Sequence, residues 1–285
     1  MKAWIGKIAV VTGASRGAGR GIAYELGQTG ATVYVTGRST QNGTTDNRPE
    51  TIEETAAGVT ARGGHGIAVR CDHTDPDDVA RLFQQIQAQH GRIDLLVNSV
   101  FGGSEASLPP GQGKRFWERP PEHWDAMMVA GPKAYLLTTR AAVPLLEQSP
   151  AALIVNLTSF SPNQAAGNLY YDLAMQSINR MTVVMGQELQ ASRIAAVALC
   201  PGFMRTERVV DAGFGSDATE TTAYVGRAVA ALMSDSTVMH RTGQALFVSD
   251  LARDYGFTDR DGTQPASFQL SDEHSTSAPT VRRKD

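Results

Sequence analysis

The 285-residue chain has few cysteines and no long apolar run. Its two cysteines, Cys71 and Cys200, lie far apart and each follows a short apolar run. They therefore predict buried thiols rather than a disulfide framework or a metal site. The longest apolar runs fall well below the roughly 18 residues that a membrane span needs. The first residues show no charged leader or cleavage site, so we expect a soluble, cytoplasmic protein with no membrane partner.

The chain also lacks a strong excess of charge of either sign. Its formal net charge is −3, with 19% charged and 41% apolar residues. This balance is typical of a globular domain and gives no reason to expect nucleic-acid binding. Lysine is scarce, and the whole set is Lys2, Lys7, Lys114, Lys133 and Lys284.

Short apolar runs rich in β-branched residues alternate with longer helical patterns. This alternation predicts an α/β fold, a doubly wound seven-stranded parallel sheet of the Rossmann type with helices on both faces. We expect strands at residues 7–12, 31–36, 66–71, 93–98, 153–158, 194–199 and 244–248. We expect helices at residues 19–28, 51–62, 77–90, 121–147, 168–190 and 219–233.

Three stretches interrupt this rhythm. Residues 39–49 form a polar loop, and residues 267–285 are polar and rich in Ser and Thr. We therefore expect one domain over residues 1–266, followed by a mobile tail over residues 267–285. The third stretch, residues 102–120, follows the fourth strand, at the edge where such sheets bind ligands. Its aromatic residues, Phe116 and Trp117, could cover a substrate or could equally anchor the loop to the core.

A glycine-rich turn follows the first predicted strand and leads straight into a helical pattern. The segment from Thr12 to Gly21 reads TGASRGAGRG. Glycines in such a turn let the backbone approach a pyrophosphate, and the helix N-terminus stabilises its negative charge. Standing between a strand and a helix, the pattern predicts a nucleotide site. The residues assigned to it are Gly13, Ser15, Arg16, Gly17, Ala18 and Gly19.

The choice between NAD(H) and NADP(H) depends on the charge at the end of the second strand. An NAD-selective site places a carboxylate there to bind the ribose 2′-hydroxyl. This strand ends instead in Thr36-Gly37-Arg38-Ser39. Arg38 and Arg16 could both reach a 2′-phosphate, which guanidinium groups bind well. We therefore predict NADP(H) as the cofactor, although either arginine alone is more often a solvated surface residue.

Three further segments follow the glycine turn in a recognisable order. They contain Asp72 after the third strand, Asn98 at the end of the fourth, and Pro201-Gly202 with Thr206 after the sixth. Over residues 5–260 the chain thereby resembles the short-chain dehydrogenase/reductase family. The resemblance implies that Asp72 contacts the adenine and that Asn98 opens a segment similar to the family's N-N-A-G. It also implies that the Pro201–Thr206 segment supports the nicotinamide carboxamide.

The family's catalytic group is Asn–Ser–Tyr–Lys, and two of these positions are kept. Ser159 stands at the Ser position, where the hydroxyl polarises the substrate oxygen, and Tyr171 follows twelve residues later. In the family the Tyr exchanges the proton of that oxygen. Tyr170 is adjacent, but neighbouring residues on a helix point in different directions.

The other two catalytic positions are substituted. Met175 stands four residues after Tyr171, where the family has Lys, and Gly131 stands at the Asn position. In the family the Lys holds the nicotinamide ribose and lowers the Tyr pKa. Lys114 and Arg115 could replace it only if their loop closes. Arg180 lies nine residues beyond Tyr171 on the same predicted helix and should face elsewhere.

These features leave three functions open. The first is an NADPH-dependent reductase of a small or polyketide-like carbonyl substrate. The second is a non-redox enzyme on the same scaffold, catalysing an elimination, isomerisation or cyclisation. The third is a redox-silent NADP-binding protein, since Met175 replaces the catalytic Lys.

The remaining predictions concern substrate, metal and assembly. We expect Phe101 and Phe203 to line the substrate site together with the two loop aromatics. His73, His123 and His240 are scattered without ligand spacing, so we expect ordinary surface or loop histidines and no metal. By analogy with the family, the two longest predicted helices should form a homodimer or homotetramer interface.

Overall fold

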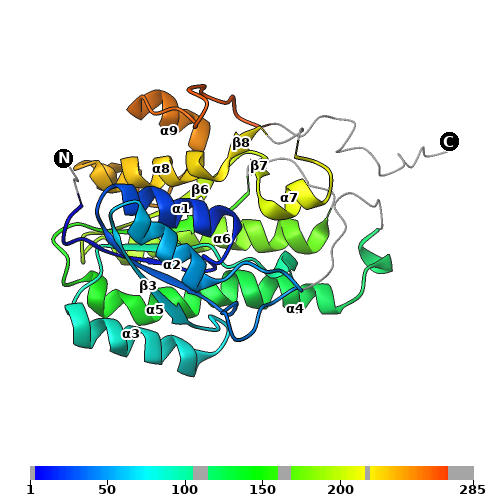
Figure 1. Ribbon diagram of the computed structural model, residues 1–285, viewed down its shortest axis with the longest axis horizontal. Helices are drawn as coiled ribbons and strands as arrows, with labels where there is room; N and C mark the ends of the chain where they lie inside the picture. The colour runs from blue at the N-terminus through cyan, green and yellow to red at the C-terminus, as the bar shows by residue number, and fades with distance from the viewer. Residues whose placement is uncertain (1–3, 105–114, 160–167, 216–218, 269–285) are drawn as a thin grey trace.

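The computed structural model describes residues 4–104, 115–159, 168–215 and 219–268 (Figure 1). Its main sheet has seven parallel strands in the order β3-β2-β1-β4-β5-β6-β9. The doubly wound Rossmann-type fold is confirmed, and every predicted strand lies within two residues of the observed one. The strands are β1 Ile8–Val11, β2 Thr32–Gly37, β3 His65–Arg70, β4 Leu95–Asn98, β5 Ala152–Leu157, β6 Ile194–Cys200 and β9 Ala245–Phe247.

Helices cover both faces of the sheet (Figure 1). In β1, Ala9 and Val11 pack into one apolar layer, whereas Ile8 and Val10 pack into the other. This two-sided burial explains why the strands read as continuous apolar runs. The first layer is closed by α1 Gly17–Gln28, α2 Ile52–Ala61 and α8 Thr222–Ser234, and the second by α3 Pro76–His90, α5 Ala134–Leu146 and α6 Leu169–Glu188.

Local side-chain chemistry sets several helix ends. The Thr51 side chain accepts a hydrogen bond from the Glu54 amide at the start of α2, and Asp75 caps α3 by accepting from the Asp77 amide. Pro76 follows as the first residue of α3, where its missing N–H costs nothing. Gly91 ends α3 in the left-handed conformation with φ of 70°, which glycine adopts without a steric penalty.

The predicted continuous helix over residues 121–147 is wrong. The chain instead forms α4 Glu122–Met128, a π-helical segment Val129–Lys133 and then α5. Gly131 departs from helical geometry, with φ of −124° and ψ of −107°. The physical reason is Pro132, which removes a backbone donor and disfavours the helical conformation of the residue before it.

Further elements lie between β6 and the end of the described chain. The sequence reading missed the short parallel pair β7 Met204–Arg205 and β8 Glu220–Thr221, and also α7 Glu207–Asp211 and α9 Val248–Tyr255. Ser267 hydrogen-bonds Ser249, and Phe268 lies 5.8 Å from Phe203 between ring centroids. Residues 269–285 lie outside the described residues, so the mobile tail stays a prediction.

Two of the helices expected at a subunit interface carry exposed leucines. Leu136 on α5 is 51% exposed, and Leu169 and Leu173 on α6 are each 40% exposed. Nothing further bears on assembly, so the homodimer or homotetramer stays a prediction. Within the described ranges, no helix is both long enough and apolar enough to cross a membrane.

Candidate active site

A cavity of about 420 Å³ lies beyond the carboxyl ends of the parallel strands. β1 and β4 are neighbours in the sheet, and the strand order reverses direction at this pair. Ligands of doubly wound sheets bind at such a switch point. The cavity wall includes the glycine turn after β1, the end of β2, and Ser159, Tyr171 and Met175. The fold thus joins most of the predicted cofactor residues with Ser159, Tyr171 and Met175 in one cavity.

The glycine turn has a geometry that only glycine accommodates. Gly13 and Gly17 have φ of +61° and +59°. A Cβ atom on Gly13 would lie 2.7 Å from the backbone oxygen of Ser99, and one on Gly19 would lie 2.5 Å from that of Gly13. The turn therefore needs its glycines for tight backbone packing, and α1 begins directly at Gly17. This arrangement fits a pyrophosphate at a helix N-terminus. Gly13, Ser15, Arg16, Gly17 and Ala18 line the cavity, whereas Gly19 packs behind the turn.

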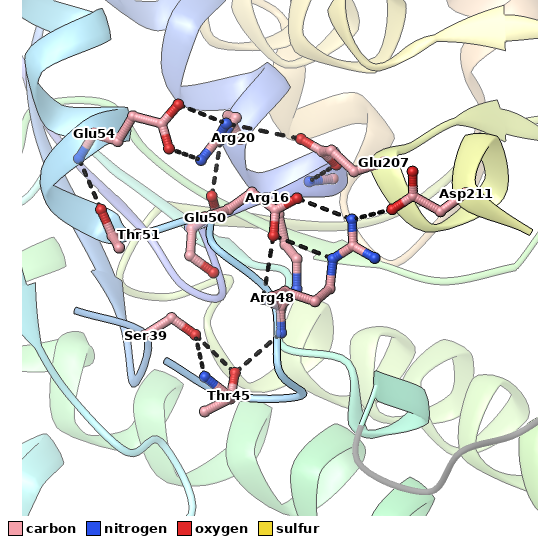
Figure 2. Close-up of polar contacts among 12 residues, drawn as sticks. Arg16, Arg20, Ser39, Thr45, Arg48, Glu50, Thr51, Glu54, Glu207 and Asp211 are labelled. Carbon is pink, nitrogen blue, oxygen red and sulfur yellow. Dashed lines mark hydrogen bonds and ion pairs between the residues drawn. The ribbon is translucent and has the colours of Figure 1, made fainter. Parts of the chain in front are cut away.

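Three arginines line the cavity near the end of β2. The predicted Arg16 and Arg38 are joined by Arg48, which comes from the polar loop after β2 and was missed in the sequence. Arg16 donates a hydrogen bond to the Thr45 hydroxyl at 3.0 Å (Figure 2). Burial lowers the pKa of Arg16, an effect that nearby carboxylates partly offset. These cations fit a phosphate group on the ribose.

Acidic residues also approach this end of the cavity, which the sequence alone did not reveal. Arg16 lies 3.8 Å from a carboxylate oxygen of Glu50, and Arg38 lies 3.8 Å from one of Asp72. Arg48 hydrogen-bonds Glu50 through two nitrogens, at 3.1 and 2.9 Å (Figure 2). The second strand ends without an acidic residue, but the loop after β2 and the segment after β3 bring carboxylates close to the arginines in space.

Asp72 lines the cavity as predicted, and its carboxylate is held by the next turn of chain. It accepts hydrogen bonds from the Thr74 amide at 2.9 Å and the Thr74 hydroxyl at 2.7 Å. Burial alone would raise the pKa of Asp72, but these hydrogen bonds and the charge of Arg38 outweigh it and lower the pKa. Asp72 is thus an ionised, fixed acceptor on the cavity wall.

Asn98 does not line the cavity, contrary to its assignment as a cofactor-binding residue. Its side chain is fully buried and donates hydrogen bonds to Thr139 at 3.0 Å and Asn156 at 2.8 Å. The Asn156 amide in turn donates to the Thr182 hydroxyl at 2.9 Å. Asn98 therefore ties β4 to β5 and α5 beneath the site.

His73 lies in the turn after β3, as expected of a loop histidine, but its side chain is buried. One ring nitrogen lies 2.8 Å from the Thr36 hydroxyl and the other 2.9 Å from the Thr138 hydroxyl. Burial lowers the pKa of His73 to about 4, so the ring is neutral at pH 7. His73 also lines the cavity and joins β2 to α5. The described residues hold no group of three or more metal-binding side chains.

The predicted pair Ser159 and Tyr171 meets at the cavity wall. A hydrogen bond joins the two side chains, and the Phe101 ring packs edge-on against Tyr171 at 6.2 Å between centroids. Burial raises the pKa of Tyr171 to about 12, and the bond with Ser159 offsets only part of this rise. Tyr171 is therefore a neutral phenol at pH 7. Tyr170 instead packs against His123.

Met175 lies in an apolar cluster beside this pair. Its side chain is 7% exposed and packs with Met127, Tyr135 and Ile178. The carbonyl of Met175 accepts a hydrogen bond from the Thr158 hydroxyl at 3.2 Å, which ties α6 to the end of β5. The groups that shift the Tyr171 pKa within the described chain include no cation.

Neither described candidate to replace that lysine is buried beside Met175. Arg115 is exposed and lies over the Trp117 ring, and Arg180 is exposed on α6. Lys114 lies outside the described residues. Gly131, at the Asn position, is buried in the π-helical segment, and a Cβ atom placed on it would meet nothing within 4 Å.

The predicted substrate residues divide into two pairs. Phe101 and Phe203 line the cavity. Phe116 and Trp117 are 54% and 62% exposed, pack edge-on against each other and line no part of it. The structure therefore does not bring these two loop aromatics to the site.

The segment after β6 forms one wall of the cavity. Pro201, Gly202 and Thr206 line it as predicted, and Thr206 caps α7 by accepting a hydrogen bond from the Val209 amide. Sequence reasoning missed Glu220 behind this wall, which is 4% exposed and accepts a hydrogen bond from the Gly202 backbone. Burial raises the pKa of Glu220 to about 7.

The chain also matches known proteins. Residues 7–217 match the family model described as short chain dehydrogenase. Dehydrogenase/reductase SDR family member 1 of Mus musculus is 33% identical over 273 residues, which cover 90% of this chain and 84% of that protein. Its Homo sapiens counterpart is 32% identical over 284 residues, covering 93% and 87%. A solved structure from Xanthomonas campestris, regarded as a dehydrogenase, is 26% identical with a TM-score of 0.79, covering 94% of this chain and 100% of that one. The protein therefore belongs to the short-chain dehydrogenase family.

Proposed function

We propose that the protein is an NADPH-dependent reductase that converts a carbonyl group of a small or polyketide-like substrate to an alcohol. The observation that carries this proposal is the hydrogen-bonded pair of Ser159 and neutral Tyr171 in the same cavity as the glycine turn. When bound, the nicotinamide would supply the hydride. The hydroxyl groups of Ser159 and Tyr171 would bind the substrate oxygen.

The protonation state of Tyr171 favours its role as an acid. With a pKa of about 12, Tyr171 carries its proton at pH 7 and can donate it to an oxygen that becomes negative. The Ser159 hydroxyl would hold that oxygen beside Tyr171 by a hydrogen bond. Alcohol oxidation requires the phenolate instead, which a group of this pKa supplies only at high pH.

The choice of NADPH over NADH rests on charge. Arg16, Arg38 and Arg48 line the end of the cavity at the carboxyl end of β2, where a 2′-phosphate would bind. Guanidinium groups bind phosphate through paired, charge-assisted hydrogen bonds. No acidic side chain follows β2 directly in the chain, where an NAD-selective site would hold one. These observations support NADP(H), although Glu50 and Asp72 reduce the net positive charge.

The methionine at position 175 should slow carbonyl reduction. A lysine at this position would place a cation one helical turn from Tyr171 and lower the Tyr171 pKa. Loss of a positioned group that assists proton transfer typically costs about 10²- to 10⁴-fold in rate. We therefore expect slow reduction by the natural chain and faster reduction by Met175→Lys.

The test follows the loss of NADPH absorbance over a panel of ketones, quinones and imines. The unaltered protein should turn over at least one carbonyl, Met175→Lys should be faster, and Tyr171→Phe should be inactive. Tyr170→Phe is the matched control, because Tyr170 is the neighbouring phenol but lines no part of the cavity, and it should keep full activity. Equal activity of the unaltered protein and Tyr171→Phe would refute the assignment.

The apolar surroundings of Met175 favour a second candidate, a non-redox enzyme or a redox-silent NADP-binding protein. The same experiment separates it from a reductase. Turnover by Met175→Lys alone, with NADPH bound but not oxidised by the unaltered protein, would support this second function.

A further inference from the structure

The short helix α7 joins the nicotinamide side of the cavity to its phosphate side. It follows Thr206 directly and carries the carboxylates Glu207 and Asp211 at its two ends. Each carboxylate contacts a group on the cavity wall (Figure 2).

Glu207 occupies an anion-binding position on the glycine turn. The Gly17 amide, the first of α1, donates a hydrogen bond to the Glu207 carboxylate at 2.8 Å. The other carboxylate oxygen lies 4.0 Å from the Arg20 guanidinium. The first amides of a helix have no partner within the helix and carry its positive dipole end, so they attract an anion. A pyrophosphate would bind the same amides for the same reason.

Asp211 binds Arg48, one of the three arginines near the end of β2. The Arg48 guanidinium donates a hydrogen bond to Asp211 at 2.7 Å and is held by Glu50 on its other side. These two carboxylates raise the pKa of Arg48, since both stabilise its charge. Arg48 lies at the end of the cavity that also contains Arg38 and Ser39. A ribose phosphate at this end would need the guanidinium that Asp211 now binds.

We propose that Glu207 and Asp211 make α7 an acidic strap that competes with the phosphates of the dinucleotide and thereby sets cofactor affinity and specificity. Glu207 opposes the pyrophosphate, which both NADPH and NADH carry. Asp211 opposes the 2′-phosphate, which only NADPH carries, by binding Arg48. This inference rests on the proposed NADP(H) site.

The attachment of α7 permits it to move when a dinucleotide binds. None of its five residues is buried, so displacing the helix exposes little apolar surface. Its other contacts include the Thr206 cap and a hydrogen bond from Arg208 to the Gly103 carbonyl. The strap can therefore separate from the turn without disrupting the core.

The test measures the dissociation constants of NADPH and NADH by dinucleotide fluorescence for the unaltered protein and three charge-neutralising variants. Glu207→Gln should bind both dinucleotides about five- to tenfold more tightly at low salt, because a unit charge a few ångströms from a phosphate is removed. Asp211→Asn should bind NADPH about two- to fivefold more tightly and leave NADH unchanged, because its side chain is more exposed. Both gains should shrink as salt is raised to about 0.5 M.

Glu54→Gln is the matched control. Glu54 lies 2.9 Å from the same Arg20 that faces Glu207, but it makes no contact with the glycine turn. It should bind both dinucleotides within about twofold of the unaltered protein, since ion pairs with an exposed carboxylate contribute little. A thermal unfolding scan of each variant confirms that the proteins compared are folded.

The outcomes separate this inference from the proposed function. Unchanged or weaker binding by Glu207→Gln, while the unaltered protein binds NADPH, would overturn the strap and leave the reductase proposal standing. An equal gain in affinity from Glu54→Gln would also overturn it. The gain would then come from the overall charge of the protein rather than from the position of Glu207. Failure of the unaltered protein and all three variants to bind either dinucleotide would overturn both proposals.

Discussion

Replacing His73 by glutamine tests how a buried neutral ring supports the site. His73 is 3% exposed and lies between the Thr36 and Thr138 hydroxyls, at 2.8 and 2.9 Å. The other groups that act on the ring are the carboxylates of Asp72 and Asp78, which raise its pKa only in part. Glutamine keeps one donor and one acceptor but does not titrate. The substitution therefore removes the proton-dependent contribution of His73 and keeps most of the bonding capacity.

The pH dependence of stability follows from the lowered pKa of His73. The pKa of His73 is about 4 in the folded protein, against an ordinary value of 6.5. Between these values the unfolded chain binds a proton that the folded protein does not, so stability rises with pH across this window. The contribution of His73 is fully present above about pH 6.5 and decreases as the pH falls towards 4. Linkage gives a loss of about 2 kcal/mol between pH 7 and pH 5 and about 3 kcal/mol by pH 4.

The assay is urea unfolding of the unaltered protein and His73→Gln at a series of pH values from 7 to 5. Other groups titrate in both proteins, so the difference between the two unfolding free energies isolates His73. At pH 7 the variant should be less stable by about 1–3 kcal/mol, because the threonine hydroxyls lose well-placed partners. At pH 5 the difference should be smaller by about 2 kcal/mol. His240→Gln, at an exposed position, is the control for the substitution itself. A difference that stays constant with pH would refute a neutral, buried His73.

Two further predictions concern the walls of the cavity. Gly13→Ala should abolish dinucleotide binding and cost more than about 1 kcal/mol of stability, because its Cβ atom would lie 2.7 Å from the Ser99 backbone oxygen. Gly262→Ala, with φ of +84° but nothing within 4 Å, should cost only about 1 kcal/mol and leave binding intact. Fluorescence titration and thermal unfolding check both. Glu220→Gln should stabilise the protein more at pH 8 than at pH 5. The folded pKa of Glu220, about 7 against 4.5, means that the folded protein releases its proton later than the unfolded chain, so its ionisation destabilises as pH rises. Denaturant unfolding at the two pH values measures this, and an equal effect at both would contradict it.

Periodicity and glycine spacing predicted the sheet and the turn because both depend on short-range chemistry. The strands of this doubly wound sheet are buried on both faces, so each reads as an unbroken apolar run such as Ile8–Val11. The turn needs Gly13 and Gly17 for their positive φ angles, which also leaves a clear trace in the sequence. The break at Gly131 was predictable too, since Pro132 follows it.

What the sequence did not reveal depends on contacts between distant segments. Nothing near His73 in the chain indicates that Thr36 and Thr138 enclose its ring. Glu207 lies 190 residues from Gly17, so the contact of α7 with the turn follows only from the fold. Short helices such as α7, with no buried residue, also lack the apolar periodicity from which a helix is predicted.

The partly exposed carboxylates Glu207 and Asp211 form the rim of the site, and the buried His73 and Glu220 belong to its base. Burial favours the uncharged form of His73 and of Glu220. The side chain of Asp211, which pairs with Arg48, is 62% exposed, and that of Glu207 is 31% exposed. Exposed pairs are screened by salt, whereas the buried groups are not. Ionic strength should therefore act on cofactor affinity through the rim, while pH acts on stability through the base.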